Sequence, residues 1–505
     1  MRVLHSLLKL ILPSTILSMK GDLTMIPNWL MQRVYLTPNK IALSYEKESW
    51  TFKQLHQVST RYARQLKTNQ LQSGDRIALL GASNVEMIFI IHACLLAGIE
   101  IVMLNNRLTD LEIAWQIEDA EVKAVLFADE FEAKVKSNKM DKISFSTVTQ
   151  SVESPFEIEE NWSPDRTITI MYTSGTTGFP KGVRQTVNNH TSSALSSVLN
   201  LGLEENDVWL CTMPLFHISG FSILVRSVLY GMEVRLYEKF DAKKIAREIY
   251  EGTITRMSVV SVMLNQILLE LERQEKKAHA SFKTMLAGGG SIPIDYLKRA
   301  NACRIPILQT YGMTETSSQT ATLSANDALR KIGSAGKPLF FNQIKINGAT
   351  RANEHGEVFI RGPHVTPGYI GRFQENSPLI DGWLPTGDIG YLDEEGYLYI
   401  VDRRSDLIIS GGENIYPAEI ENVLAAHPKV REVGVCGKEH PKWGQTPVAF
   451  VVVYEKIEAE ELMKYCEEQL AKYKVPSEII FIESLPRNAS NKLLRRELKQ
   501  WLPQQ

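Results

Sequence analysis

Short apolar runs alternate with helical stretches in the N-terminal part of the chain, and this alternation limits the possible folds more than any other feature. A buried strand comes first, then an apolar helix, a strand, a second helix and another strand, over residues 73–83, 85–99, 100–104, 108–120 and 122–129. Thr109 is a suitable N-cap for the second helix. Strands that alternate with helices in this way form a parallel sheet with helices on its faces.

The same alternation resumes further along the chain, at residues 206–237, 241–272, 283–287 and 305–308. From about residue 331 the sequence changes character. Short β runs such as QIKIN, GEVFIRG and GYLYIV stand between Gly- and Pro-rich turns there. These runs predict a smaller antiparallel β unit.

A second boundary is expected at DRRS, residues 402–405. Beyond it the pattern predicts helices and strands in a compact α+β unit, with helices at 416–428 and 458–476 and strands at 430–437 and 446–454. The predicted fold class is therefore α/β, with a large N-terminal body of parallel-type sheets and helices, a small β unit, and a smaller mobile C-terminal α+β domain. The expected divisions are residues 25–402, a hinge at 403–405, and residues 406–505.

Residues 1–24 begin with a basic, apolar stretch that has some features of a secretory signal. Lys9 and Pro13 interrupt the stretch, no A-x-A cleavage site follows, and only ten residues separate Lys9 from Lys20, too few to span a bilayer. We expect a disordered extension or a misassigned start, with the folded protein beginning near Met25. The apolar run at 87–99 is also too short to span a membrane, so we expect no stable membrane insertion.

Composition narrows the class of partner. The chain has 56 Lys and Arg against 58 Asp and Glu, and this balance provides no overall field for binding nucleic acid. Five scattered cysteines, an odd number without a C-x-x-C pair, argue against a disulfide framework or a cysteine-based zinc site. They favour a reducing compartment, and we expect the cytoplasm.

The strongest local signal is TITIMYTSGTTGFPKGV, residues 167–183, in which a strand leads directly into a loop of hydroxyl and glycine residues. Glycines let the backbone approach a phosphate, while N–H groups, hydroxyls and Lys181 bind its oxygens. The loop lacks the G-x-x-x-x-G-K-[ST] spacing of a Walker A motif. It predicts a different kind of phosphate-binding loop.

This loop resembles the phosphate loop of the adenylate-forming superfamily, which includes acyl-CoA synthetases, adenylation domains and firefly-type luciferases. Three further segments are similar to its motifs: QTYGMTET (309–316), GWLPTGDIGYLDEEGYLYIVDRRSDLIISGGENIYPAEIE (382–421) and RNASNKLLRREL (487–498). Within the superfamily, MPLFHISGFSILVRSVLYGMEV and YGMTETSSQ look like the bacterial CoA ligases that activate 2-succinylbenzoate for menaquinone biosynthesis.

The resemblance implies a two-step reaction that uses ATP, Mg²⁺ and CoA. A carboxylate attacks ATP to give an acyl-adenylate and pyrophosphate, and the CoA thiol then releases AMP. The implied catalytic residues are Lys492, His217, Glu315 and Thr314, with Glu315 as the metal ligand. The implied ATP and AMP contacts are Thr173, Ser174, Gly175, Thr176, Thr177, Gly178, Lys181, Gly288, Gly289, Gly290, Tyr311, Asp388 and Arg403.

Other roles follow from the same resemblance. Ser405 is implied as the hinge residue, where the family commonly has Asp or Lys, and Asn491 precedes Lys492 where the family often has Gly. Gly411, Gly412 and Glu413 are expected along the CoA channel. The second carboxylate of 2-succinylbenzoate needs a donor. The candidates are Ser222, Ser317, Ser318, Gln319 and Arg226, which sequence alone does not rank.

Several other functions stay open at this level. The chain could be a different aryl- or acyl-CoA ligase, or an adenylation enzyme that loads a separate carrier protein. A luciferase-like oxidoreductase is a more remote alternative, since it needs oxygen-dependent product formation and nothing in the sequence points to it. An inactive binding protein is also remote, because the catalytic motifs are all intact. The expected partners are small molecules, namely a carboxylic acid, ATP and CoA, and a homo-oligomer is left open.

Overall fold

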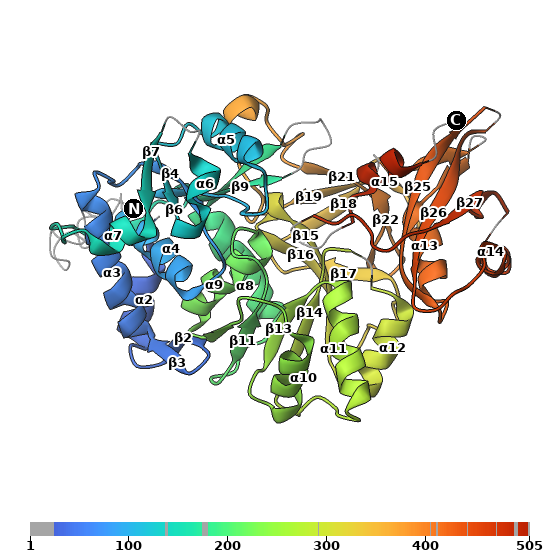
Figure 1. Cartoon of the computed structure of the whole chain (residues 1–505), viewed down its shortest axis with the longest axis horizontal. Coiled ribbons are helices and arrows are strands. Elements are labelled where there is room, and N and C mark those ends of the chain that lie inside the picture. The colour runs from blue at the N-terminus through green and yellow to red at the C-terminus, as the bar shows by residue number, and fades with distance from the viewer. Residues whose placement is uncertain are drawn as a thin grey trace, which may run out of the picture.

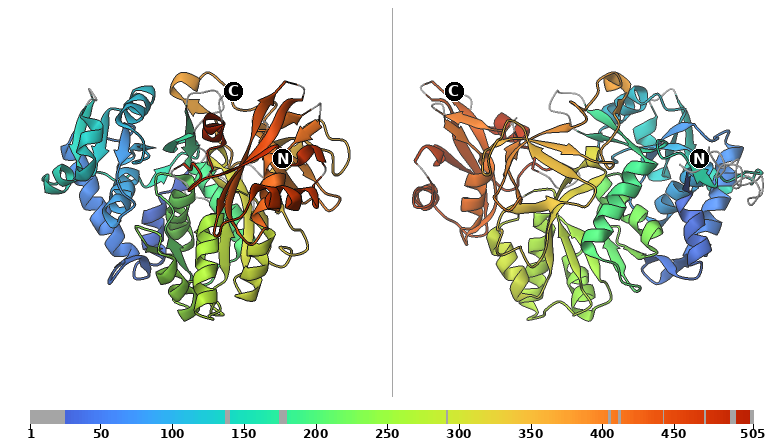
Figure 2. Two further views of the ribbon diagram at one scale, coloured as in Figure 1. Left: turned by 45° about the vertical axis from the view of Figure 1, so that its right-hand side comes forward. Right: turned by 180° about the vertical axis from the view of Figure 1, so that it is seen from behind.

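The computed structural model describes residues 25–136, 140–173, 180–290, 292–403, 406–410, 413–441, 443–470, 472–488 and 493–502. The predicted extension, residues 1–24, lies outside this set. A large N-terminal body contains two extended sheets, and a smaller C-terminal unit stands beside the antiparallel end of the second sheet (Figure 1). Figure 2 shows the same arrangement from two other sides.

The first sheet, as described, has the strand order β20-β10-β9-β5-β4-β6-β7. Its inner strands pair in parallel, as the alternation predicted, while β10 and β20 add an antiparallel edge. The strands are β4 (Arg76–Leu80), β5 (Glu100–Met103), β6 (Ala124–Phe127), β7 (Asp141–Ser144), β9 (Thr167–Thr173), β10 (Lys181–Thr186) and β20 (Tyr369–Ile370). A separate short pair joins β1 (Ile26–Pro27) to β8 (Asn161–Trp162).

The second sheet continues through both halves of the N-terminal body, in the order β18-β19-β21-β22-β17-β16-β15-β14-β13-β11-β12-β2-β3. Within this sheet, β15, β14, β13, β11, β12 and β2 pair with one another in parallel. The pairs from β15–β16 onward, including β21–β22, are antiparallel. The strands are β2 (Ile41–Tyr45), β3 (Glu48–Thr51), β11 (Val208–Cys211), β12 (Glu233–Leu236), β13 (Arg256–Val259), β14 (Thr284–Ala287), β15 (Ile307–Met313), β16 (Ser318–Leu323), β17 (Ser334–Pro338), β18 (Gln343–Ile346), β19 (Gly356–Arg361), β21 (Leu384–Leu392) and β22 (Leu398–Arg403).

The antiparallel unit predicted from about residue 331 is present, but it is not separate from the parallel strands. The strand β17 pairs with β16 on one side and with β22 on the other. The direction changes at β15 and β16, which a single 3₁₀ turn at Thr314–Thr316 connects. The local sequence indicates the change to short β runs and Gly- and Pro-rich turns, but it does not indicate this long-range strand pairing.

Helices cover both sheets. They are α2 (Trp29–Leu36), α3 (Phe52–Thr68), α4 (Val85–Ala97), α5 (Asp110–Asp119), α6 (Glu132–Val135), α7 (Phe145–Gln150), α8 (Val187–Leu201), α9 (Ile218–Tyr230), α10 (Ala242–Glu251), α11 (Ser261–Arg273) and α12 (Ile294–Ala302). The side chain of Thr109 caps α5, as predicted. No helix in the described part of the chain is long and apolar enough to cross a membrane.

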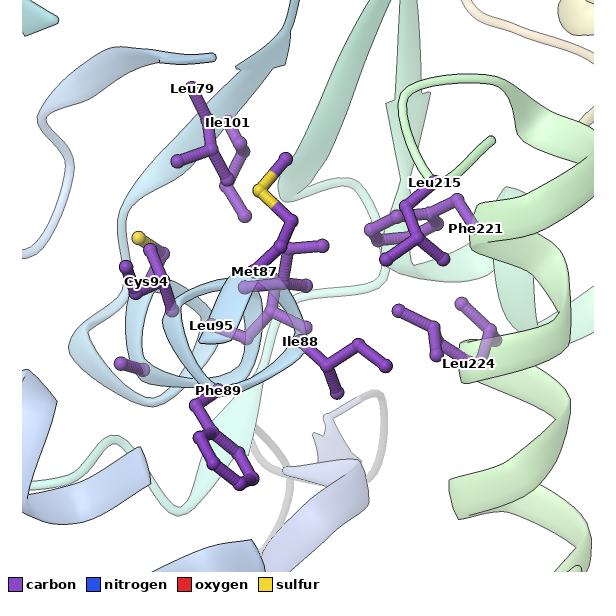
Figure 3. Packing of buried hydrophobic residues seen from close by; sticks show 14 of the residues in the cluster. Leu79, Met87, Ile88, Phe89, Cys94, Leu95, Ile101, Leu215, Phe221 and Leu224 are labelled. Atoms are coloured by element: carbon purple, nitrogen blue, oxygen red, sulfur yellow. The ribbon is translucent and has the colours of Figure 1, made fainter. Parts of the chain in front are cut away.

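The apolar run predicted as a buried helix is α4. Nearly every residue of this helix is buried, because it lies between two layers. Figure 3 shows its side chains between Leu79 and Ile101 of the first sheet and the side chains of Leu215, Phe221 and Leu224. Gly98 ends α4 with a φ of 73°, a conformation that favours glycine.

The C-terminal unit has the predicted α+β composition. Its strands run in the order β24-β23-β26-β25, with β27 parallel to β26. The elements are β23 (Ile408–Ser410), β24 (Glu413–Ile415), α13 (Pro417–Ala425), β25 (Val430–His440), β26 (Gly444–Val453), α14 (Ala459–Glu467), β27 (Glu478–Phe481) and α15 (Arg495–Leu498). The helix predicted at 458–476 was too long, because the chain must return after α14 to place β27 beside β26.

Candidate active site

Two loops that carry predicted motifs meet at the ends of their strands. The strand β9 ends at Thr173, where the phosphate motif begins, and β15 ends at Met313, just before Thr314 and Glu315. A hydrogen bond from Gln185 Nε2 to the Thr314 carbonyl, 2.8 Å long, connects the two segments. The phosphate motif and the YGMTE motif are therefore neighbours in space.

Lys181 stands directly opposite Thr173 in the β9–β10 ladder. Its ammonium group lies 5.1 Å from the ring centroid of Tyr369 and 5.4 Å from that of Phe373. Aromatic faces attract a cation without neutralising its charge. No described carboxylate forms a salt bridge with Lys181, so the charge is available to a phosphate group. The rest of the predicted loop, Ser174, Gly175, Thr176, Thr177 and Gly178, lies outside the described residues.

Glu315 lies on the same side of the site. The main chain of its turn is held by Thr366, whose N–H donates to the Glu315 carbonyl over 2.7 Å. Burial and the nearby carboxylate of Glu315 raise the pKa of Tyr369 well above its ordinary value. Tyr369 therefore lies close to both Lys181 and Glu315. Tyr369 and Phe373 were not predicted as site residues, because they lie outside every recognised motif.

The predicted nucleotide residues also come together. The Tyr311 hydroxyl donates to Asp388 Oδ2 over 2.6 Å, and Asp388 is buried. Arg403 is the residue opposite Asp388 in the β21–β22 ladder. The glycine turn after β14 approaches β15, the strand that bears Tyr311, since a Cβ on Gly288 would lie 2.9 Å from Thr310 Cγ2. Gly289 follows with a φ of 82°.

His217 begins the helix α9 as its N-cap residue, and no side-chain capping bond is made there. Its Nε2 atom is buried and has no hydrogen-bond partner among the described residues. Burial, helped by the nearby charge of Arg107, lowers the pKa of His217 to about 4. The imidazole is therefore neutral at pH 7 and has a nitrogen available to a ligand.

Arg226 lies on α9, one helical turn beyond Ser222, and only 1% of it is exposed. Its Nη2 atom donates to Gln319 Oε1 over 2.9 Å and to Ser318 Oγ over 3.2 Å. The guanidinium lies over the Trp209 ring, 5.1 Å from its centroid. Its Nε atom is buried without a hydrogen-bond partner in the described structure.

No carboxylate pairs with Arg226 within the described residues. Burial lowers its pKa from the ordinary value. A buried cation without a counter-ion is costly and uncommon in proteins. The three predicted acyl-site residues Arg226, Ser318 and Gln319 are thus brought together around an uncompensated charge. Within the described residues, the Ser222 hydroxyl makes only a long contact to the Ser219 carbonyl, at 3.5 Å.

The remaining predicted residues lie in the C-terminal unit or its junction. Lys492, Ser405, Gly411 and Gly412 are outside the described residues. The chain on either side of Lys492 is tied down, because Arg487 and Leu493 form a β-bridge. Further along, Arg495 forms a salt bridge with Glu421 at 2.5 Å.

Comparisons with known proteins agree with this geometry. Residues 30–370 match the family described as AMP-binding enzyme, and residues 419–492 match the AMP-binding enzyme C-terminal domain. The chain is 47% identical over 481 residues to the 2-succinylbenzoate–CoA ligase of Bacillus subtilis (strain 168), covering 94% of this chain and 98% of that protein.

Two solved structures are informative together. The o-succinylbenzoate coenzyme A synthetase from Bacillus subtilis in complex with ATP and magnesium has a TM-score of 0.89 at 46% identity, covering 94% of this chain and all of that chain. A double mutant of the same enzyme, bound to its product analogue OSB-NCoA, has a TM-score of 0.74 at 46% identity, covering 94% and 98%. The overall arrangement of this chain is thus more similar to the ATP complex.

Proposed function

Since the chain belongs to the AMP-binding enzyme family, we propose that it joins 2-succinylbenzoate to coenzyme A in an ATP-dependent reaction of menaquinone biosynthesis. The acid attacks the α-phosphate of ATP, which gives an acyl-adenylate and releases pyrophosphate. The CoA thiol then attacks the acyl carbon, which forms the thioester and releases AMP. The activity is that of an AMP-forming acid–thiol ligase.

The observation that carries the choice of acid is the environment of Arg226. 2-Succinylbenzoate has one aliphatic carboxylate, which is activated, and one aromatic carboxylate, which is not. A buried guanidinium without a carboxylate partner in the described structure supports a role as the counter-ion of the aromatic carboxylate. Ser318 and Gln319 orient the guanidinium through their hydrogen bonds.

The first step brings an anionic acid to a polyphosphate, so positive charge must be supplied. Lys181 meets the β- and γ-phosphates, together with the loop hydroxyls. Lys492 meets the carboxylate and the α-phosphate. Glu315 holds Mg²⁺, and Thr314 contacts the α-phosphate. One carboxylate beside a phosphate-binding lysine fits Mg²⁺, which commonly takes one or two carboxylates with substrate phosphates and water. When bound, the ion neutralises phosphate charge.

The nucleoside is recognised on the other side of this charge. Tyr311 and the turn at Gly288, Gly289 and Gly290 enclose the adenine. Asp388 and Arg403 accept and donate hydrogen bonds at the ribose hydroxyls. The bond between Tyr311 and Asp388 supports this assignment, because it fixes the ring and the carboxylate relative to each other.

The second step requires a different arrangement of the two parts of the chain. We place the N-terminal domain at residues 25–402, the hinge at 403–405 with Ser405 as its pivot, and the C-terminal domain at 406–505. Rotation about the hinge removes Lys492 and brings the Gly411–Gly412 segment to the CoA channel. Neutral His217 stands at the mouth of the acyl pocket, where its imidazole gates the approach of the carboxylate.

We further propose that the protein acts in the cytoplasm. All five cysteines are buried and unpaired in the structure, as expected where disulfides do not form. The partners are the acid, ATP and CoA, without nucleic acid.

A thioester assay tests the proposed function. The purified chain is given ATP, Mg²⁺, CoA and one acid from a panel that includes 2-succinylbenzoate, benzoate, a fatty acid and an amino acid. We expect thioester, AMP and pyrophosphate to form in equal amounts with 2-succinylbenzoate and only slowly with the others. Faster turnover of another acid, or adenylate formation without transfer to CoA, would favour the alternative ligase or the carrier-loading enzyme.

A further inference from the structure

The turn between β15 and β16 has a backbone that few sequences adopt without support. Ser317 has a φ of 49° and Ser318 a φ of 110°, although neither is glycine. The chain also folds closely on itself, since a Cβ on Gly312 would lie 1.7 Å from the Ser318 carbonyl oxygen. Such a conformation persists only where the surroundings hold it in place.

Three groups from outside the turn hold its carbonyl oxygens. Gln185 Nε2 donates to the Thr314 carbonyl over 2.8 Å, and the Thr366 N–H donates to that of Glu315 over 2.7 Å. The Ser193 hydroxyl donates to the Ser317 carbonyl over 2.7 Å. Of these three donors, Gln185 has an extended set of hydrogen bonds behind it.

Gln185, Thr169 and His190 form that set, one from each of three elements. The Thr169 hydroxyl on β9 lies 2.7 Å from Gln185 Oε1 on β10 and 2.8 Å from His190 Nε2 on α8. All three side chains are at most 2% exposed. No water competes for these bonds, so each group depends on its protein neighbour.

The chemistry of the groups gives each bond a single direction. A carbonyl only accepts, so the Gln185 amide must turn its NH₂ toward Thr314 and its oxygen toward Thr169. The hydroxyl proton of Thr169 is then donated to that oxygen, and its lone pair must accept from His190. Burial lowers the pKa of His190 to about 3, so the ring is neutral and its one N–H is at Nε2.

We propose that His190, Thr169 and Gln185 are positioning residues for adenylation, which set the turn of Thr314 and Glu315 relative to the phosphate-loop strands. The proposal rests on the proposed function for the roles of Thr314 and Glu315. The set joins the strands that bear Thr173 and Lys181 to the turn that bears the metal ligand. A change in it would misplace the carboxylate of Glu315 relative to bound nucleotide without removing a contact to substrate.

Thr169→Val tests this directly, because it keeps the shape of the side chain and removes its hydroxyl. We expect ATP–pyrophosphate exchange to slow about 10-fold, as for the loss of one buried hydrogen bond, and half-saturation to need more Mg²⁺. Thioester formation from synthetic acyl-adenylate and CoA should stay near the wild-type rate. Thr169→Ser, which restores a hydroxyl, should recover most of the exchange rate.

Thr320→Val is a matched control, since the Thr320 hydroxyl also bonds a buried histidine, His364, at 3.1 Å. No hydrogen bond in the described part of the chain joins the Thr320 and His364 side chains to the turn. Loss of the pair should therefore affect thermal stability but not the Mg²⁺ requirement. The proposal is overturned if Thr169→Val and Thr320→Val slow exchange equally, or if Thr169→Val slows both half-reactions equally.

A second variant and a choice of acid complete the test. If Thr169→Val does not fold, Gln185→Met removes the donor to Thr314. The same slower exchange, higher Mg²⁺ requirement and retained thioester formation are then expected of Gln185→Met. Exchange can be driven by any acid that the wild-type enzyme adenylates. Failure of 2-succinylbenzoate as a substrate would therefore contradict the proposed function, while the response to Mg²⁺ would still decide the role of the positioning residues.

Discussion

Two cationic side chains in this structure lie among uncharged groups. Lys181 lies over aromatic rings, and Arg226 lies over a tryptophan with amide and hydroxyl neighbours. A carboxylate partner in the protein would neutralise each charge before the substrate arrived. Pairing with neutral groups keeps both charges in place for anionic substrates, which is the arrangement expected for preorganised electrostatic catalysis.

Lys492, near the C-terminus of the chain, is a third cationic residue that we propose meets the anionic substrates. Lys492→Ala should abolish adenylate formation, because the lysine is required where the carboxylate meets the α-phosphate. Transfer from synthetic acyl-adenylate to CoA should be largely retained, since the proposed rotation about the hinge removes the lysine before this step. The two half-reactions are measured separately by pyrophosphate exchange and by thioester release. Equal loss of both would show that the role assigned to Lys492 is wrong.

At the scale of elements, α4 joins the two sheets because it is apolar on every side. Its one titratable histidine, His92, is 4% exposed and lies among Trp29, Trp162 and leucine side chains. Burial lowers the pKa of His92 to about 4, from an ordinary value of 6.5. Between these values the unfolded chain binds a proton that the folded chain does not.

His92 therefore stabilises the fold fully above pH 6.5, and this contribution is lost as the pH falls toward 4. We expect the free energy of unfolding to drop between pH 7 and pH 5, with about 2 kcal/mol of the drop due to His92. The variant His92→Leu should show a pH dependence that is smaller by that amount in denaturant titrations. The exposed His279→Gln serves as the control, and equal pH dependence in both variants would contradict the assignment.

The elements themselves were predictable where the signal is local. The strand and helix pattern at 73–129 and the antiparallel runs after 331 are confirmed, because periodicity and turn residues determine them nearby in sequence. The pairing of β16 with β17 and the position of Tyr369 under Lys181 were not predicted. Each depends on residues far apart in the chain, for which one sequence offers no signal.

Some candidate site residues were predictable from local motifs, and others could be ranked only from the structure. Tyr311 and Asp388 were identified from separate motifs, and the structure joins them by a hydrogen bond. Sequence could not choose among the acyl-site candidates, because a serine, a glutamine and an arginine are all plausible donors. Burial alone does not distinguish them, because Ser222, Ser317 and Gln319 are buried as well. Arg226 differs because its buried group carries a charge and has no carboxylate partner in the described structure.

At the scale of the whole molecule, the contacts that join the described parts of the C-terminal unit and the N-terminal body include a hydrogen bond and a ring contact. Asn265 Nδ2 on α11 donates to the Tyr454 hydroxyl over 3.1 Å, while Asn265 Oδ1 accepts from Arg299. The His355 ring meets Tyr416 edge-on, with centroids 5.9 Å apart. The chain is more similar to the solved ATP complex than to the product-analogue complex, so we expect these contacts to belong to the arrangement for adenylation.

Tyr454→Phe should therefore weaken the adenylation arrangement. Loss of one hydrogen bond should lower the ratio of adenylation to thioester formation about 2- to 10-fold. Single-turnover measurements of the two half-reactions provide this ratio, and Tyr35→Phe, at an exposed position, provides the control. An unchanged ratio would mean that the contact does not help to hold the two parts together.

We propose that this chain ligates an acid whose second carboxylate is bound by Arg226. The most direct test compares kcat/KM for 2-succinylbenzoate and for 4-oxo-4-phenylbutanoate, which lacks only the aromatic carboxylate, in the wild type and in Arg226→Met. We predict that the wild type prefers 2-succinylbenzoate by about 10- to 150-fold and that Arg226→Met loses most of this preference. Similar activity on both acids in the wild type, or a preference that Arg226→Met retains, would contradict the account.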